Sequence, residues 1–186
     1  MCKNIVVFHV HDLPVSSMVM GGEAFESIVS AHHGEIYRYL RRVVGSAGPE
    51  ADDLSQETFL RAYRAYAALP RDANVRAWLF SIASNLAKNY FRSELRRRRA
   101  YAEVEITARG ASDTAPETDA ISRETGALVE RVVRRLPVKQ RMAFTQRKIH
   151  GMDYAVIGES LGCSAETARA HVFQALRKIR QALDGC

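Results

Sequence analysis

Apolar residues recur along this chain at the three- and four-residue spacing that places them on one face of an α-helix. The first stripe begins near Glu23 and stops at Gly45, a residue suited to cap the carboxyl end of a helix. Pro49 favours the first turn of a second helix, which we expect to run to about Leu69. No apolar–polar alternation lasts long enough to build a sheet. The pattern therefore predicts an all-α protein.

A third predicted helix opens near Asp72 or Asn74 and carries a very basic segment. Its expected core face consists of Val75, Trp78, Leu79, Ile82, Leu86 and Tyr90. The helix can continue through AKNYFRSELRRRR, residues 87–99, which holds six Lys or Arg beside two aromatic rings and an Asn. Such a segment is either a solvated helix face or a surface for nucleic acid, and the local pattern alone leaves both readings open.

The helical pattern stops over residues 100–123. Residues 101–124 are rich in Ala, Ser, Thr and Gly and have a net charge of −4, against +6 for the whole chain. Because such a segment can bury little apolar surface, we expect an acidic flexible linker. It would join two small helical domains, residues 23–99 and residues 124–183.

The first residues of the chain do not resemble a secretory signal peptide, because the apolar stretch 5–10 is short and polar residues and a proline follow it. We expect residues 1–22 to form a disordered N-terminal extension. Translation that starts at Met18 or Met20 is the alternative.

Composition narrows the classes of function. A chain of 186 residues with a net charge of +6 favours a polyanionic partner, either nucleic acid or an anionic membrane surface. Its three Cys lack the spacing of zinc ligands. Four histidines could contribute to a metal site, but no suitably placed further ligand completes one; they are His9, His11, His32 and His33. No apolar run approaches the roughly 20 residues that span a bilayer. We expect a reduced, cytoplasmic protein with no cofactor, no membrane insertion and no active site.

The carboxyl-terminal pattern predicts a helix-turn-helix. Residues 152–180 read MDYAVIGESLGCSAETARAHVFQALRKIR, with Asp153 and Ser164 as expected N-caps and Gly162 in the turn. One side of the second helix is apolar. The other suits DNA, because its early residues can contact base edges and its later basic residues can contact phosphates. An ordinary pair of packed helices with a solvated basic face is the alternative.

Two separated stretches resemble one family. ADDLSQETFLRAYRAY (51–66), followed by NVRAWLFSIASNLAKNYFRSELRRRR (74–99), is similar to the sigma-2 domain of sigma-70 family RNA polymerase sigma factors. LPVKQRMAFTQRKIHGMDYAVIGESLGCSAETARAHVFQALRKIR (136–180) resembles the sigma-4 domain. With no recognisable domain before or between them, the chain looks like the small extracytoplasmic-function (ECF) group. The resemblance covers about residues 23–99 and 124–183.

The resemblance implies a sigma factor, a subunit that binds core RNA polymerase, recognises a promoter and opens it without catalysing a reaction. Core polymerase would be contacted through its beta-prime clamp helices and its beta flap. The residues implied for docking on the clamp are Asp52, Asp53, Leu54, Gln56, Glu57 and Leu60. An anti-sigma factor is the other protein partner that the family implies.

The resemblance also implies two surfaces for promoter DNA. The residues implied for binding and melting the −10 element are Asn85, Lys88, Asn89, Arg92 and Arg96. Asn85 and the loop 70–75 are candidates for the pocket that holds a flipped base. The residues implied for the −35 element are Ser164, Glu166, Thr167, Arg169, Ala170, Phe173, Gln174 and Arg177.

One departure from the family bears on the −35 sequence. The family commonly has basic residues where this chain has His171 and Gln174, so its base preference is left open. Phe173 could contact a thymine methyl or pack on a neighbouring helix. A sigma-like decoy, which sequesters a regulator without starting transcription, is the alternative function. The complete basic helix and helix-turn-helix favour the sigma factor, because a decoy has no need of DNA chemistry.

Overall fold

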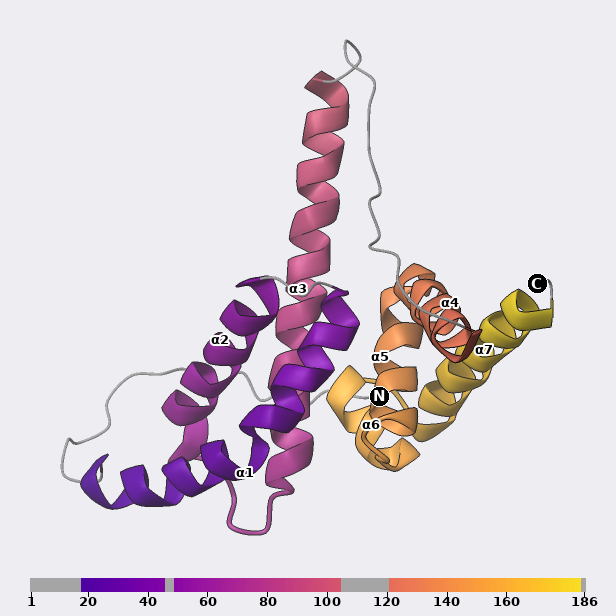
Figure 1. Ribbon diagram of the computed structural model, residues 1–186. Helices are drawn as coiled ribbons and strands as arrows, with labels where there is room; N and C mark the ends of the chain where they lie inside the picture. Colours follow the sequence, from indigo (N-terminus) through magenta and orange to yellow (C-terminus); the bar gives the residue numbers. More distant parts are fainter. Residues whose placement is uncertain (1–17, 46–48, 105–120, 185–186) are drawn as a thin grey trace.

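The computed structural model describes residues 18–45, 49–104 and 121–184, and these ranges form seven helices and no strand (Figure 1). The helices are α1 (Met18–Val44), α2 (Pro49–Tyr66), α3 (Val75–Val104), α4 (Ile121–Arg135), α5 (Val138–Lys148), α6 (Tyr154–Leu161) and α7 (Ala165–Asp184). The predicted all-α fold is confirmed. None of the described helices is both long and apolar enough to cross a membrane.

Local signals set the ends of the first three helices. Gly45 adopts a left-handed φ of 76°, and its N–H donates to the carbonyl of Arg41 at 3.0 Å, which closes the end of α1. Pro49 is the first residue of α2, as predicted. The Asn74 side chain caps α3 by accepting a hydrogen bond from the backbone N–H of Ala77 at 3.0 Å.

Three boundaries differ from those expected. Helix α1 begins at Met18, so residues 18–22 are helical although we assigned them to the extension; residues 1–17 lie outside the described part of the chain. Helix α2 ends at Tyr66 rather than near Leu69. Helix α3 continues to Val104 and α4 begins at Ile121, so both ends of the expected linker are helical, and its residues 105–120 lie outside the described ranges.

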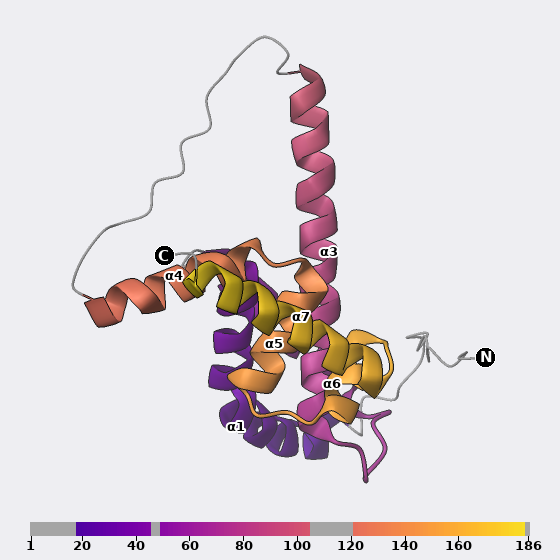
Figure 2. The same ribbon diagram turned by 90° about the vertical axis from the view of Figure 1, so that its right-hand side faces the viewer.

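The predicted core face of α3 is confirmed only in part. Leu79 and Leu86 are buried as expected, whereas the other four predicted residues are only half-buried. Phe80, outside the predicted face, is completely buried. The reason is that α3 has neighbours on two sides, with α1 and α2 on one and α6 on the other (Figures 1 and 2). A stripe chosen for a single neighbour therefore misses the second line of contact.

The helix-turn-helix is formed by α6 and α7. Gly162 follows α6 with a left-handed φ of 68°, and Ser164 caps α7 by accepting a hydrogen bond from the N–H of Thr167 at 3.2 Å. Gly158 allows the turn between α6 and α7 to pack closely against α6, because a Cβ at this position would lie 2.7 Å from the carbonyl oxygen of Cys163. Asp153 precedes α6 in an extended conformation, but its side chain makes no capping hydrogen bond, so its predicted N-cap contact is wrong.

The two helical domains share one continuous core. Leu40, Phe80 and Ala87 of the first domain belong to the same buried cluster as Met142 and Ile157 of the second. Helices α5 and α6 lie against α1 and α3 (Figure 2). We call this contact between α1/α3 and α5/α6 the seam. It holds the predicted DNA-binding helices of both domains in one body.

Candidate nucleic-acid interface

The outer side of α2 has the predicted acidic character. Asp52, Asp53 and Gln56 are exposed, and Leu60 has 44% of its surface accessible. Leu54 is only partly exposed, because it packs against the core.

Glu57, the sixth of these residues, is half-buried and accepts a hydrogen bond from Arg61 at 2.6 Å on the helix surface. On the inner side of α2, Ser55, Thr58, Phe59 and Ala62 are buried and Tyr66 packs against the core. The outer side thus offers carboxylates, an amide and one apolar anchor for a basic partner.

The polar stripe on α3 is exposed except at one position. Asn85, Asn89, Arg92 and Arg96 face solvent. Lys88 is half-buried: its Nζ donates to Oδ1 of Asn85 at 3.3 Å and to the carbonyl oxygen of Leu161, at the end of α6, at 3.0 Å. Burial, together with repulsion from Lys139, lowers the pKa of Lys88. The seam therefore engages the middle of the predicted −10 surface.

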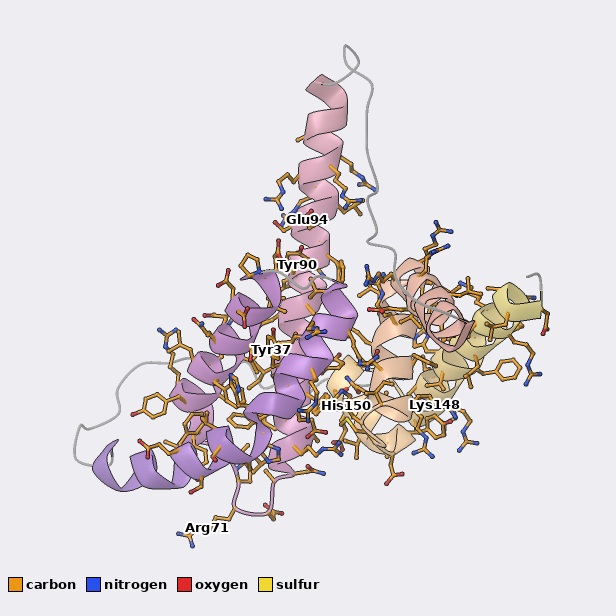
Figure 3. The ribbon with its side chains drawn as sticks, viewed as in Figure 1. Tyr37, Arg71, Tyr90, Glu94, Lys148 and His150 are labelled. Atoms are coloured by element: carbon orange, nitrogen blue, oxygen red, sulfur yellow. The ribbon has the colours of Figure 1, made fainter. Side chains whose placement is uncertain are left out.

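The two candidates for a base pocket lie at different heights along α3. The loop 70–75 precedes the helix, and Figure 3 shows Arg71 pointing away from the body there. Asn85 lies ten residues after Val75, which at about 1.5 Å per residue is roughly 15 Å along the axis. Their joint role in one base pocket stays a prediction.

The basic end of α3 projects beyond the rest of the described helices (Figure 1). Arg96, Arg97, Arg98 and Arg99 are all exposed. Glu94, which Figure 3 shows on this projecting part, pairs with Arg97 and, at 4.0 Å, with Arg98. The end of α3 consequently keeps a net positive charge that can follow a phosphate backbone.

The recognition helix α7 presents every predicted −35 residue to solvent. The exposed set is Ser164, Glu166, Thr167, Arg169, Ala170, Phe173, Gln174 and Arg177. Phe173 has 65% of its surface accessible, so it does not pack on a neighbouring helix. The opposite side of α7 is buried through Ala168, Val172, Ala175 and Ile179. The helical spacing in the sequence predicted both the exposed side and the buried side of α7.

Tyr154 supports the arginine at the start of α7. The guanidinium of Arg169 lies 5.1 Å from the centre of the Tyr154 ring, and that of Arg147 lies 4.8 Å from it. Such contacts restrain an exposed guanidinium and are worth about 0.5–1 kcal/mol. The role of Tyr154 as a support depends on α5, α6 and α7 meeting, which no local sequence pattern reveals.

A buried cluster of neutral polar groups joins the domains at the seam. Nε2 of Gln146 donates to the Tyr39 hydroxyl and to Oγ of Ser84, both at 3.1 Å. The hydroxyl of Ser160 donates to Oε1 of Gln146 at 2.6 Å, and Tyr39 and Ser84 bond to each other at 2.7 Å. All four side chains are at most 1% exposed, and burial raises the pKa of Tyr39 to about 12. We call them the seam amide cluster.

A charged cluster lies beside it. Nε of Arg76 donates to Oε2 of Glu35 at 3.0 Å, and Nδ1 of His150 lies 3.1 Å from Oε1 of the same carboxylate. Arg76 also donates to the backbone carbonyl of His150 at 2.5 Å. The His150 ring is 4% exposed and contacts the rings of Tyr39 and Phe80. Figure 3 shows His150 between the two domains.

The pKa shifts in this cluster have clear causes. Burial lowers the pKa of His150 more strongly than its hydrogen bond to Glu35 raises it. Burial by itself would raise the pKa of Glu35, but Arg76 and His150 outweigh it, and the pKa is lowered. His150 is therefore neutral and Glu35 ionised near neutral pH. Sequence reasoning singled out none of the residues of these two clusters.

Comparison with known proteins agrees with this arrangement. A model of sigma-70 region 2 matches residues 28–98, and a model of sigma-70 region 4 matches residues 127–179. The RNA polymerase sigma-H factor of Pseudomonas aeruginosa is 32% identical over 170 residues, which cover 86% of each chain. The ECF RNA polymerase sigma-E factor of Escherichia coli strain K12 is 31% identical over 169 residues, 87% of this chain and 85% of that protein.

Solved structures share the fold. The sigma factor RpoE of Bartonella quintana, solved with the anti-sigma factor NepR, has a TM-score of 0.66 at 18% identity and covers 87% of this chain and 98% of its own. CnrH, solved with the cytosolic domain of CnrY, has a TM-score of 0.65 at 23% identity, with 91% and 94% covered. The chain belongs to the ECF group of the sigma-70 family of RNA polymerase sigma factors. The family and the sigma-factor function expected from the sequence are confirmed; the role of each site residue stays a prediction.

Proposed function

We propose that this sigma factor contacts the −35 element through α7 and opens the −10 element with the polar stripe of α3. The observation that carries the proposal is the exposure of all eight predicted −35 residues on one side of α7. Hydroxyl, amide, guanidinium and apolar groups on that side match the kinds of contact that base edges and phosphates offer. The exposed amides Asn85 and Asn89, followed by arginines, suit an unpaired strand.

The protein partners follow from the same surfaces. The acidic outer side of α2 would dock on the beta-prime clamp helices, and the second domain would lie at the beta flap. The chain would act as a specificity subunit in the cytoplasm, with no active site of its own. An anti-sigma factor is also proposed as a partner. RpoE, which shares this fold, was solved bound to the anti-sigma factor NepR, and CnrH was solved bound to the cytosolic domain of CnrY.

Promoter binding requires the two domains to separate. The positions that name the −35 and −10 elements differ by about 25 base pairs, which is roughly 85 Å at about 34 Å per turn of about ten base pairs. Helix α3 is 30 residues long, about 45 Å, and α6 lies directly against it. Lys88 is moreover bonded to Leu161 across the seam. Packed domains cannot reach both elements, so breaking the seam belongs to the proposed mechanism.

Transcription with the Asn85→Ala variant tests whether the polar stripe of α3 opens the −10 element. On a linear promoter, the variant assembled with core polymerase should bind the −35 duplex normally but show reduced permanganate reactivity of unpaired thymines. On a template with a pre-opened bubble it should recover much of its activity, because the cost of opening has been removed in advance. Normal opening by the variant, or no recovery on the bubble, would remove Asn85 from that role.

A transcription assay with the unaltered protein distinguishes a sigma factor from a sigma-like decoy. A sigma factor with core polymerase should give run-off transcripts from some members of a promoter library. A decoy would bind its regulator and give none on any member.

A further inference from the structure

Gln174, one of the two residues at which α7 departs from the family pattern, is held by a short chain of hydrogen bonds. Nε2 of Gln140, on α5, donates to Oε1 of Gln174 at 2.6 Å. Nζ of Lys178, one turn further along α7, donates to Oε1 of Gln140 at 3.1 Å. Both bonds lie within the second domain, so they persist when the seam opens.

The lysine sets the direction of the whole chain of bonds. An ammonium group can only donate, so the group that Gln140 turns toward Lys178 must be its oxygen. The Gln140 amide nitrogen then faces Gln174, and Gln174 must offer its oxygen in return. The amide nitrogen of Gln174, with its two hydrogens, is left on the exposed side of α7.

We infer that Lys178 and Gln140 are positioning residues that fix the amide of Gln174 as a hydrogen-bond donor toward the −35 element. A freely rotating glutamine reads adenine by donating to N7 and accepting from N6. The oxygen of Gln174 is turned toward Gln140 on α5, so the nitrogen and not the oxygen faces the DNA side, which disfavours that paired contact. Guanine offers two adjacent acceptors, N7 and O6, in the major groove. At the base that Gln174 contacts, the protein should therefore prefer guanine to adenine.

The inference rests on the proposed contact between α7 and the −35 element, and the test distinguishes the two. Full-length protein with core polymerase selects promoters from a library with a randomised −35 element, and the bound sequences are counted. Wild type should favour guanine over adenine roughly tenfold at one position. A selection with no preference anywhere in the −35 element would overturn the proposed contact. If the protein selects −35 sequences but prefers adenine to guanine at the position that Gln174 contacts, the inference is overturned while the proposed contact stands.

Gln140→Glu is the decisive variant. It keeps the size of the side chain and its bond to Lys178, but it presents an acceptor to Gln174. Gln174 must then turn its nitrogen inward and its oxygen toward DNA. The preference at that position should move from guanine to the bases with an exposed donor, adenine or cytosine. A merely structural role for Gln140 would leave the base preference unchanged.

Two controls complete the experiment. Gln174→Ala identifies the contacted position, because the guanine preference should disappear there and nowhere else. Lys139→Gln, at an exposed neighbour, changes the net charge as Gln140→Glu does but leaves the bonds intact. It should weaken binding evenly across sequences, since phosphate contacts carry no base information. An unchanged guanine preference in Gln140→Glu, or the same switch in Lys139→Gln, would overturn the inference.

Discussion

Two glutamines on α5 show how differently the seam and the outward surfaces use one residue type. Gln146 is completely buried and bonded to three side chains from α1, α3 and α6. Gln140, six residues earlier, lies at the surface of the second domain and forms hydrogen bonds with Gln174 and Lys178 of α7. The seam residue satisfies groups that water cannot reach, whereas the surface residue directs a group toward a partner. Changes at the seam should therefore alter the free energy of unfolding, and changes outside should alter recognition.

Gln146→Leu should give the largest effect on stability. The variant removes three buried hydrogen bonds and leaves hydroxyls of Tyr39, Ser84 and Ser160 without their amide partner. A loss of about 2–3 kcal/mol is expected, because a buried polar group without its partner bears its desolvation cost. Urea unfolding followed by circular dichroism measures it. Gln140→Leu, on the same helix, is the matched control and should change stability by less than about 0.5 kcal/mol. Equal losses in the two variants would contradict the comparison.

Tyr39→Phe should have a smaller effect than Gln146→Leu. It removes one hydroxyl from the seam amide cluster while keeping the ring that packs on Phe80. Ser84 and Gln146 remain bonded to each other, so the expected loss is about 1–2 kcal/mol. The double variant with Ser84→Ala tests the coupling, because residues of one network are not additive. A double variant whose loss equals the sum of the two single losses would show that the hydroxyls act independently.

Acidification should weaken the seam in two steps. The pKa of His150 is lowered in the fold, so its contribution is present above its ordinary value near 6.5 and is lost as the pH falls below that value. The slope cannot exceed about 1.4 kcal/mol per pH unit for one proton. The pKa of Glu35 is also lowered, so a second loss follows below about 4.5.

Unfolding free energies measured from pH 7.5 to 5.5 report the first step. His150→Phe keeps an aromatic ring in the seam and removes one of two histidines whose pKa is lowered by burial; the other, His171, remains. The curve of the variant should therefore be less steep than that of the wild type over that range. Equal slopes in the two proteins would show that His150 does not titrate with folding.

The acidic outer side of α2 should give the smallest change in stability. Asp53→Lys and Glu57→Lys together reverse two surface charges and break one exposed pair with Arg61. Exposed pairs contribute little, so each change should stay within about 0.5 kcal/mol. Capture of core polymerase should nevertheless fall strongly. Undiminished capture would remove this side of α2 from the polymerase interface.

The sequence predicted features that depend on neighbouring residues and missed those that depend on packing. Gly45 and Pro49 mark helix ends through their own backbone preferences, and the exposed side of α7 follows from helical spacing. Residues 101–104 were assigned to a linker because of the composition around them, yet they continue α3. The burial of Phe80 and Gln146 could not be predicted, because it requires the second domain to lie on α3.

The two sides of the seam are synthesised at different times. Gln146 bonds to Ser84, which is made 62 residues earlier, and to Tyr39, which is made 107 residues earlier. A ribosome adds about 5–20 residues per second, so roughly 3–12 s separate Ser84 from Gln146. Throughout that interval Lys88 of the nascent α3 lacks its partner Leu161. Only the finished second domain can cover Lys88, so each newly made molecule of this sigma factor passes first through a state in which the seam is open.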